Sequence, residues 1–69
     1  IKFFLPESGM ASLKVMDMLG KTVYTLVNDY LPAGNHQRDL FLKSLPEGIY
    51  YYTLTQGNFT ETKRLIHTK

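Results

Sequence analysis

Apolar and polar side chains alternate along most of this chain, and the period of the alternation is two residues. The pattern is clearest in the segment 11–16, where Ala11, Leu13 and Val15 alternate with Ser12, Lys14 and Met16. Successive side chains of a β-strand point to opposite faces, so a period of two predicts strands that bury one face. Helix-forming residues are present in the segment 10–19, but its apolar positions do not repeat every three to four residues. The pattern therefore indicates β-structure.

The strongest strand pattern follows directly after a turn signal. Pro46 has a fixed φ angle and no N–H, and Gly48 can adopt a positive φ, so Pro46-Glu47-Gly48 predicts a turn. In the segment 49–54 that follows, aromatic and β-branched residues occupy both faces, which predicts a central strand. Its expected inward face is Tyr50, Tyr52 and Leu54, packed on Leu13, Val15 and Val23.

Turn residues divide the rest of the chain into further short strands. Pro6 ends the first strand, and Gln56-Gly57-Asn58 precedes the last, whose polar alternation is typical of an edge strand protected by charge. Leu65 and Ile66 are expected to form the buried end of that last strand. The strands expected besides the central one are residues 1–5, 11–16, 21–30, 35–42 and 59–67.

A type I turn is expected between the second and third strands. Asp17 stands at its first position and Gly20 at its fourth, an arrangement that favours a hairpin with a bulge. We expect Gly20, like Gly48, to have a positive φ angle. Glycine adopts such an angle readily, whereas a β-branched residue is strained there.

The third and fourth strands are less regular. Val23 is the expected inward residue of the third strand, with a bend near Thr25, and loops are expected at Asn28-Asp29 and at 31–34. Arg38 is expected to lie at the sheet rim or to pair with an acid, because an unpaired buried charge is costly. One face of the fourth strand is expected to carry His36, Arg38, Leu40 and Leu42.

Six to seven short strands with turn signals at intervals of about 8–12 residues predict an all-β fold. We expect a small immunoglobulin-like antiparallel β-sandwich, formed by residues 1–69 as a single domain of a longer chain. Gly48 followed by Tyr50 is similar to the corner before the penultimate strand of immunoglobulin-like folds. The chain has no cysteine and no tryptophan, so an antibody-type domain is excluded.

Composition excludes several classes of function. Without cysteine neither a disulfide nor a thiolate metal site can form, and His36 and His67 lie far apart, so we expect no metal or cofactor. The net charge of +2 comes from scattered cations, of which only Lys63-Arg64 are adjacent, so nucleic acid is not an expected partner. No apolar run approaches the ~18 residues of a membrane helix. No nucleophile with a base, carboxylate pair or phosphate loop is present, so we do not expect an enzyme.

Five segments in order make the chain resemble the type A C-terminal sorting domain of proteins exported by the type IX secretion system of Bacteroidota. They are 5–9 (Leu-Pro-Glu-Ser-Gly), 13–23 (Leu-Lys-Val-Met-Asp-Met-Leu-Gly-Lys-Thr-Val), 31–36 (Leu-Pro-Ala-Gly-Asn-His), 45–54 (Leu-Pro-Glu-Gly-Ile-Tyr-Tyr-Tyr-Thr-Leu) and 63–69 (Lys-Arg-Leu-Ile-His-Thr-Lys). The structural positions of the family motif would be Asp17, Gly20, Gly34, Leu45, Pro46, Gly48, Tyr50, Tyr52 and Leu54. Possible receptor-docking residues are Lys63, Arg64, Leu65, Ile66 and Lys69.

The resemblance implies a non-catalytic secretion signal. It would direct a cargo protein, covalently linked on its N-terminal side, from the periplasm across the outer membrane to the cell surface or the medium. Its partners would be the outer-membrane translocon and the sortase-like processing components of the type IX machinery. The alternative is an extracellular immunoglobulin-like accessory or adhesion module of a secreted hydrolase, in which the three adjacent tyrosines supply stacking surface.

Overall fold

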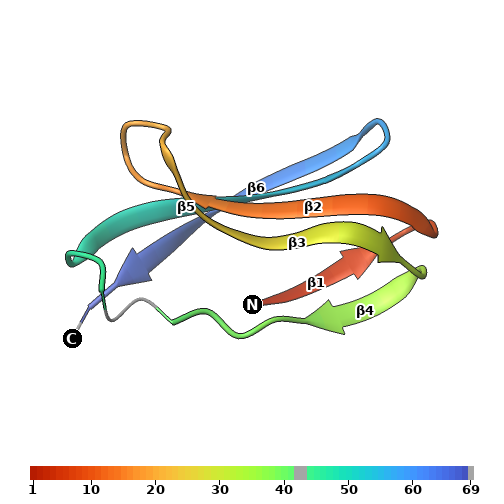
Figure 1. The fold of residues 1–69 in the computed structure, drawn as a ribbon, viewed down its shortest axis with the longest axis horizontal. Coiled ribbons are helices and arrows are strands. Elements are labelled where there is room, and N and C mark those ends of the chain that lie inside the picture. Colours follow the sequence, from red (N-terminus) through yellow and green to blue (C-terminus); the bar gives the residue numbers. More distant parts are fainter. Residues whose placement is uncertain (42–43, 69) are drawn as a thin grey trace.

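Six antiparallel strands form two sheets in the computed structural model, which describes residues 1–41 and 44–68 (Figure 1). No helix occurs within these two ranges. This arrangement is a small β-sandwich, as the alternating pattern predicts. The strands are β1 (Lys2–Leu5), β2 (Gly9–Met16), β3 (Thr22–Leu31), β4 (Gly34–Gln37), β5 (Gly48–Gln56) and β6 (Phe59–His67).

The larger sheet has four strands in the order β3-β2-β5-β6, so β2 and β5 lie in its interior. The prediction that 49–54 is a central strand is therefore confirmed. Leu13 of β2 stands opposite Leu54 of β5, and Val15 stands opposite Tyr52. Directly opposed residues share a face, so the alternating apolar residues of both strands point to the same side of the sheet.

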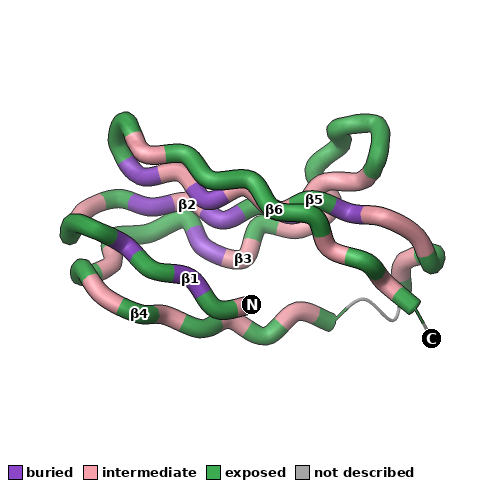
Figure 2. The backbone as a smooth tube through the Cα atoms, turned by 180° about the vertical axis from the view of Figure 1, so that it is seen from behind, coloured by how far each residue is buried: buried purple, intermediate pink, exposed green. Residues whose placement is uncertain are grey.

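The smaller sheet pairs β1 with β4 and faces that apolar side as a second layer (Figure 1). Phe3 and Leu5 of β1 point inward, and the buried segments of β1, β2 and β5 lie close together in Figure 2. The hydrophobic cluster between the layers comprises Phe3, Leu5, Ala11, Leu13, Val27 and Leu54. Tyr50 is buried and Tyr52 half-buried, so the predicted inward face of the central strand is confirmed.

The turn between β2 and β3 is held by the side chain and backbone of Asp17. Its Oδ1 accepts hydrogen bonds from the backbone N–H groups of Leu19 and Lys21, each at 2.9 Å. Gly20 N–H donates to the Asp17 carbonyl at 3.1 Å, and the Gly20 φ is 85°. Gly48 also has a positive φ, 155°, so both glycine predictions are confirmed.

The pairing of β3 with β2 shifts twice. Leu13 pairs with Val27 and Lys14 with Thr25, so Leu26 is an extra residue in the ladder, which confirms the predicted irregularity near Thr25. The second shift leaves Val23 unpaired between Tyr24 and Thr22. As a result Val27 is buried, whereas Val23, the expected inward residue, is only half-buried.

Two expected boundaries were wrong. Asn28 and Asp29 belong to β3 rather than to a loop, because they pair with Ser12 and Ala11 of β2. β4 ends at Gln37, so most of the expected strand 35–42 is not a strand, and Leu42 lies outside the described residues.

The ladder between β1 and β4 ends at the pair Lys2 and Gln37, beyond which Ile1 and Arg38 exchange backbone hydrogen bonds at 2.8 and 2.9 Å. The Arg38 side chain is half-buried and donates to the carbonyl of Gln37 at 2.8 Å rather than to an acid.

Leu54→Ala tests the inward face. Leu54 is only 2% exposed and contributes to the cluster between the sheets, so the substitution should lower the free energy of unfolding. The expected loss is about 2–5 kcal/mol, measured by urea denaturation of the purified chain. Leu19→Ala is the matched control, since Leu19 is exposed and its truncation leaves no cavity. Equal stability of the two variants would show that the inward face is wrongly assigned.

Gly20→Val tests the turn. A β-branched residue at φ 85° is strained, so unfolding should become easier by about 1–3 kcal/mol, even though valine also restricts the unfolded chain. Nothing lies within 4 Å of a Cβ built at this position, so a steric clash would not explain the loss. A thermal melt indistinguishable from that of the parent would contradict the assignment.

Candidate docking surface on the edge strand

The free edge of β6 is the first candidate for binding another chain. Within the described residues β6 pairs only with β5, and the two-residue turn Gly57-Asn58 joins them, with Gln56 opposite Phe59. In such a hairpin the closing pair is hydrogen-bonded and the next pair is not. Alternation along the ladder therefore directs the backbone N–H and C=O groups of Thr60, Thr62, Arg64 and Ile66 away from β5.

The predicted docking residues lie on two faces of this strand. Arg64 and Ile66 point to the outer face, opposite Tyr51 and Ile49 of β5. Ile66 is 59% exposed and Leu65 half-buried, so the expectation that both residues are buried was wrong for Ile66. An edge strand has a neighbour on one side only, which leaves its outer side chains in water. Lys69 lies outside the described residues.

Lys63 belongs to the inner face, since it stands opposite Tyr52, yet it is exposed. Its Nζ lies 3.3 Å from Oε1 of Glu61, another exposed residue of the inner face. The two-stranded sheet does not cover this part of β6. An exposed ion pair of this kind contributes little stability, but inward-pointing charges on an edge strand discourage unwanted strand pairing.

The motif residues before β5 form a corner. Tyr50 Oη donates a hydrogen bond to the carbonyl of Pro46 at 2.6 Å, four residues earlier in the chain. This hydrogen bond fixes the entry of the chain into β5. Of the residues before the corner, Leu45 is half-buried and Pro46 exposed. This is the arrangement expected from Gly48 followed by Tyr50, and it corresponds to the tyrosine corner of immunoglobulin-like sandwiches. Gly34, the remaining turn residue, begins β4.

The two histidines lie in separate places. The ring of His36 stacks on Phe3 with centroids 5.4 Å apart, and its Nε2 donates to the Pro32 carbonyl at 2.7 Å. His67 lies beside Tyr50, with ring centroids 6.4 Å apart. In residues 1–41 and 44–68 no three histidine, aspartate or glutamate side chains group as metal ligands would.

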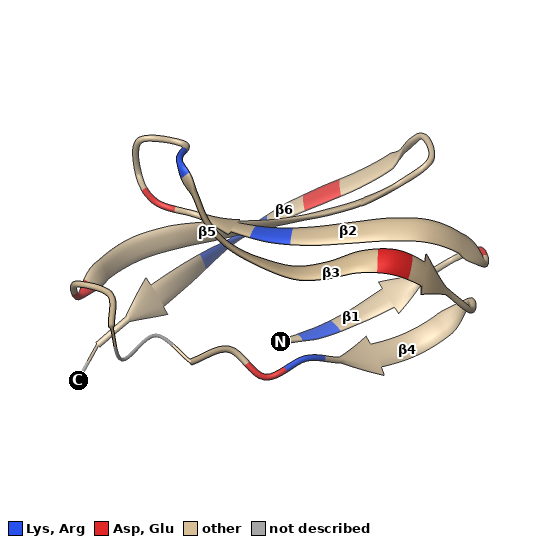
Figure 3. Ribbon diagram, viewed as in Figure 1, with Lys and Arg blue, Asp and Glu red and all other residues tan. Residues whose placement is uncertain are grey.

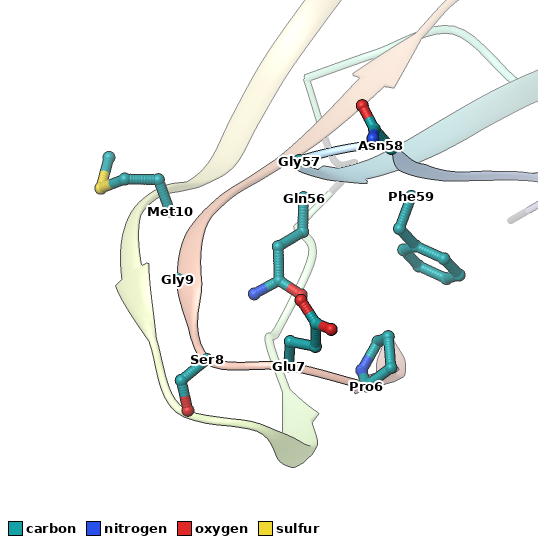
Figure 4. Close-up of a pocket in the computed structure, with 9 residues that line it drawn as sticks. All are labelled: Pro6, Glu7, Ser8, Gly9, Met10, Gln56, Gly57, Asn58 and Phe59. Carbon is teal, nitrogen blue, oxygen red and sulfur yellow. The ribbon is translucent and has the colours of Figure 1, made fainter.

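Sequence reasoning missed a hollow at the β5–β6 turn, with a volume of about 670 Å³ and open to solvent (Figure 4). Gln56 points into it and is buried, and its Nε2 has no hydrogen-bond partner among the described residues. A Cβ added at Gly9 would lie 3.8 Å from that nitrogen. Pro6 and Phe59 supply apolar wall, and Glu7, Ser8 and Asn58 are the other polar residues of the lining.

Charges are scattered over the strands and turns rather than gathered in one field (Figure 3). Nor does the described part of the chain contain a helix with the length and apolar character needed to cross a membrane.

The family model of the secretion system C-terminal sorting domain matches residues 1–68. The chain therefore belongs to the family of C-terminal sorting domains of type IX secretion. Neither the comparison with curated proteins nor the comparison with solved structures found a match.

Membership of this family implies a sorting signal, a secreted or cell-surface protein, and contact with both the type IX machinery and a cargo. The fold agrees with such a role, because its described features are a packed sandwich, exposed edges and turns.

Tyr50→Phe tests the corner. The substitution removes the bond to the part-buried Pro46 carbonyl, and the expected cost is about 0.5–1.5 kcal/mol of unfolding free energy. Tyr51→Phe is the matched control on the neighbouring residue, whose side chain lies on the other face and is exposed. Urea denaturation of both variants measures the difference. If the two variants are equally stable, the hydroxyl of Tyr50 does not hold the corner.

Proposed function

We propose that this domain is the export address of a secreted protein. A cargo attached on its N-terminal side is carried from the periplasm through the outer-membrane translocon, and sortase-like components then process the domain at the surface. The family match over residues 1–68 is the observation that carries this proposal.

The free edge of β6 offers a receptor a place to bind the domain. Arg64 and Ile66 present backbone groups and exposed side chains at its C-terminal end. An extended segment of a receptor adds to such an edge by backbone hydrogen bonds, while the outward side chains supply specificity. Lys63, Leu65 and Lys69 remain part of this proposed docking segment.

The alternative, an adhesion module that stacks sugars on its tyrosines, has less support. Tyr50 is buried with its hydroxyl bonded to Pro46, Tyr52 is half-buried, and only Tyr51 lies on the outer face. Alternation along a strand separates the three rings, so they do not form one stacking platform.

Fusion to a foreign periplasmic protein tests the export role. In a bacterium with a type IX system, the fusion should reach the surface or the medium, measured by protease shaving of intact cells and by blotting the medium. Deleting residues 65–69 should leave the folded cargo in the periplasm. A cargo that is displayed equally well without this segment would reject the proposed docking end and favour an extracellular module.

Ile66→Pro tests the same docking end without removing any part of β6. Its N–H points to the free edge, so proline removes a donor that a receptor would use without breaking the β5–β6 ladder. Thr60→Pro is the matched control, because it removes an equivalent free-edge N–H near the Gly57-Asn58 turn. We expect export to be lost for the first variant and kept for the second. Loss of export in both would point to a general effect on the strand.

A further inference from the structure

Among the described residues the large sheet has two free edges, and they differ in regularity. β3 forms one edge, and its ladder with β2 is interrupted by two register shifts. Such bulges twist an edge and hinder a further strand from pairing with it. β6 forms the other edge, and its pairing with β5 runs without a shift from His67 to Phe59. The edge of β6 is therefore the one along which the sheet can continue.

The small sheet does not shield this edge on the inner side. A hollow of about 460 Å³ is lined by Phe4 of β1 and by Glu61 and Lys63 of β6, so open space separates the two layers along this part of the strand. Both charged residues are exposed. A strand added beside β6 would meet its backbone groups and these two side chains.

The sequence of β6 is complementary to itself when two copies run antiparallel. Thr60, Thr62 and Arg64 direct their backbone N–H and C=O groups to the free edge, and two strands exchange hydrogen bonds where such residues face one another. When Thr62 of one copy stands opposite Thr62 of the other, Thr60 of each copy stands opposite Arg64 of the other. This register therefore pairs free backbone groups with free backbone groups along the edge.

The same register places opposite charges together on the inner face. Glu61 of each copy faces Lys63 of the other, and Phe59 faces Leu65. Within one copy, Oε1 of Glu61 already lies 3.3 Å from Nζ of Lys63. In the paired strands the carboxylates and ammonium groups of the two copies alternate. Opposite charges directly across a ladder stabilise the pairing, whereas like charges weaken it.

Nearby registers are disfavoured by the same charges. An axis at Glu61, Lys63 or Arg64 in place of Thr62 sets that charged residue opposite its own copy, and like charges in such positions oppose association. Charges on an edge strand ordinarily protect it against pairing. Here they exclude neighbouring alignments and favour the one centred on Thr62.

We propose that two copies of this domain associate through β6, antiparallel and about a two-fold axis at Thr62, so that their large sheets become one. The contact is isologous, as a closed two-fold dimer requires. A single pair of strands makes a small interface, so the association is weak and depends on concentration. This inference goes beyond the proposed function, because pairing covers the same edge that a receptor would use, and the receptor would have to displace the second copy.

Charge reversal in the purified chain tests the register. The parent should show a monomer–dimer equilibrium in sedimentation analysis over a range of concentrations. Glu61→Lys and Lys63→Glu each convert both opposed pairs into like-charged pairs, so each should raise the dissociation constant about tenfold or more. Lys21→Glu is the matched control, since Lys21 is exposed and precedes β3 at the other edge of the sheet. This control should dimerise as the parent does.

An equimolar mixture of Glu61→Lys and Lys63→Glu provides the rescue. In the mixed pair a lysine again faces a glutamate at both positions, so the mixture should associate like the parent. Thermal melts show whether each variant is folded. A parent that stays monomeric at every concentration, single variants that dimerise like the parent, or a mixture no better associated than its components would each overturn the proposal.

Crosslinking locates the axis. The chain has no cysteine, so an introduced cysteine is its only thiol. A short bifunctional thiol reagent should join two copies of Thr62→Cys into a dimer. Thr25→Cys is the matched control, because Thr25 is also an exposed threonine on an edge strand, β3. Equal yields from the two positions would indicate random collision and reject the proposed pairing, and neither measurement depends on export.

Discussion

The pairing of β2 with β5 is the constraint on which the rest of the structure depends. Leu13 and Leu54 stand opposite each other at the centre of the sheet, and both are buried against β1. The chain has no cysteine, so no disulfide supplements this packing. A domain of this length buries only about 60% of its unfolded surface, which leaves little reserve if one central side chain is lost. Burial of this one apolar face therefore holds the fold together.

The two-stranded layer is narrower than the four-stranded layer, and this difference determines which surfaces of the large sheet remain exposed. A two-stranded sheet covers one side of a four-stranded sheet only in part. Glu61 and Lys63 point to the inner side of β6 yet stay in water, and the outer face of the large sheet has no covering layer among the described residues. Since neither surface is needed for the core, side chains there can change at small cost in stability. Recognition is best placed on such surfaces.

Most of the architecture could be predicted from local patterns. Alternation predicted the strands, and the position of Asp17 and Gly20 predicted the hairpin, because both signals lie within a few residues. Asn28 and Asp29 were misplaced because polar side chains also occur on exposed strands, where pairing with β2 rather than composition decides. The fourth strand was predicted too long because the alternation continues past Gln37, whereas the pairing with β1 ends at that residue. Both strand boundaries were predicted wrongly because they depend on pairing with a segment that is distant in the sequence.

The candidate docking site was even harder to predict from local sequence patterns than the strand boundaries. The basic C-terminal end could be proposed from the sequence, whereas Met18 and Leu19 look like ordinary turn residues until the fold sets them beside Glu47 and Ile49. A surface assembled from segments distant in the sequence exists only in the folded state. A receptor that binds it discriminates folded from unfolded domains, because the unfolded chain presents the same side chains without their arrangement. Recognition of such a surface would therefore couple export to correct folding of the address, which a linear terminal signal alone does not do.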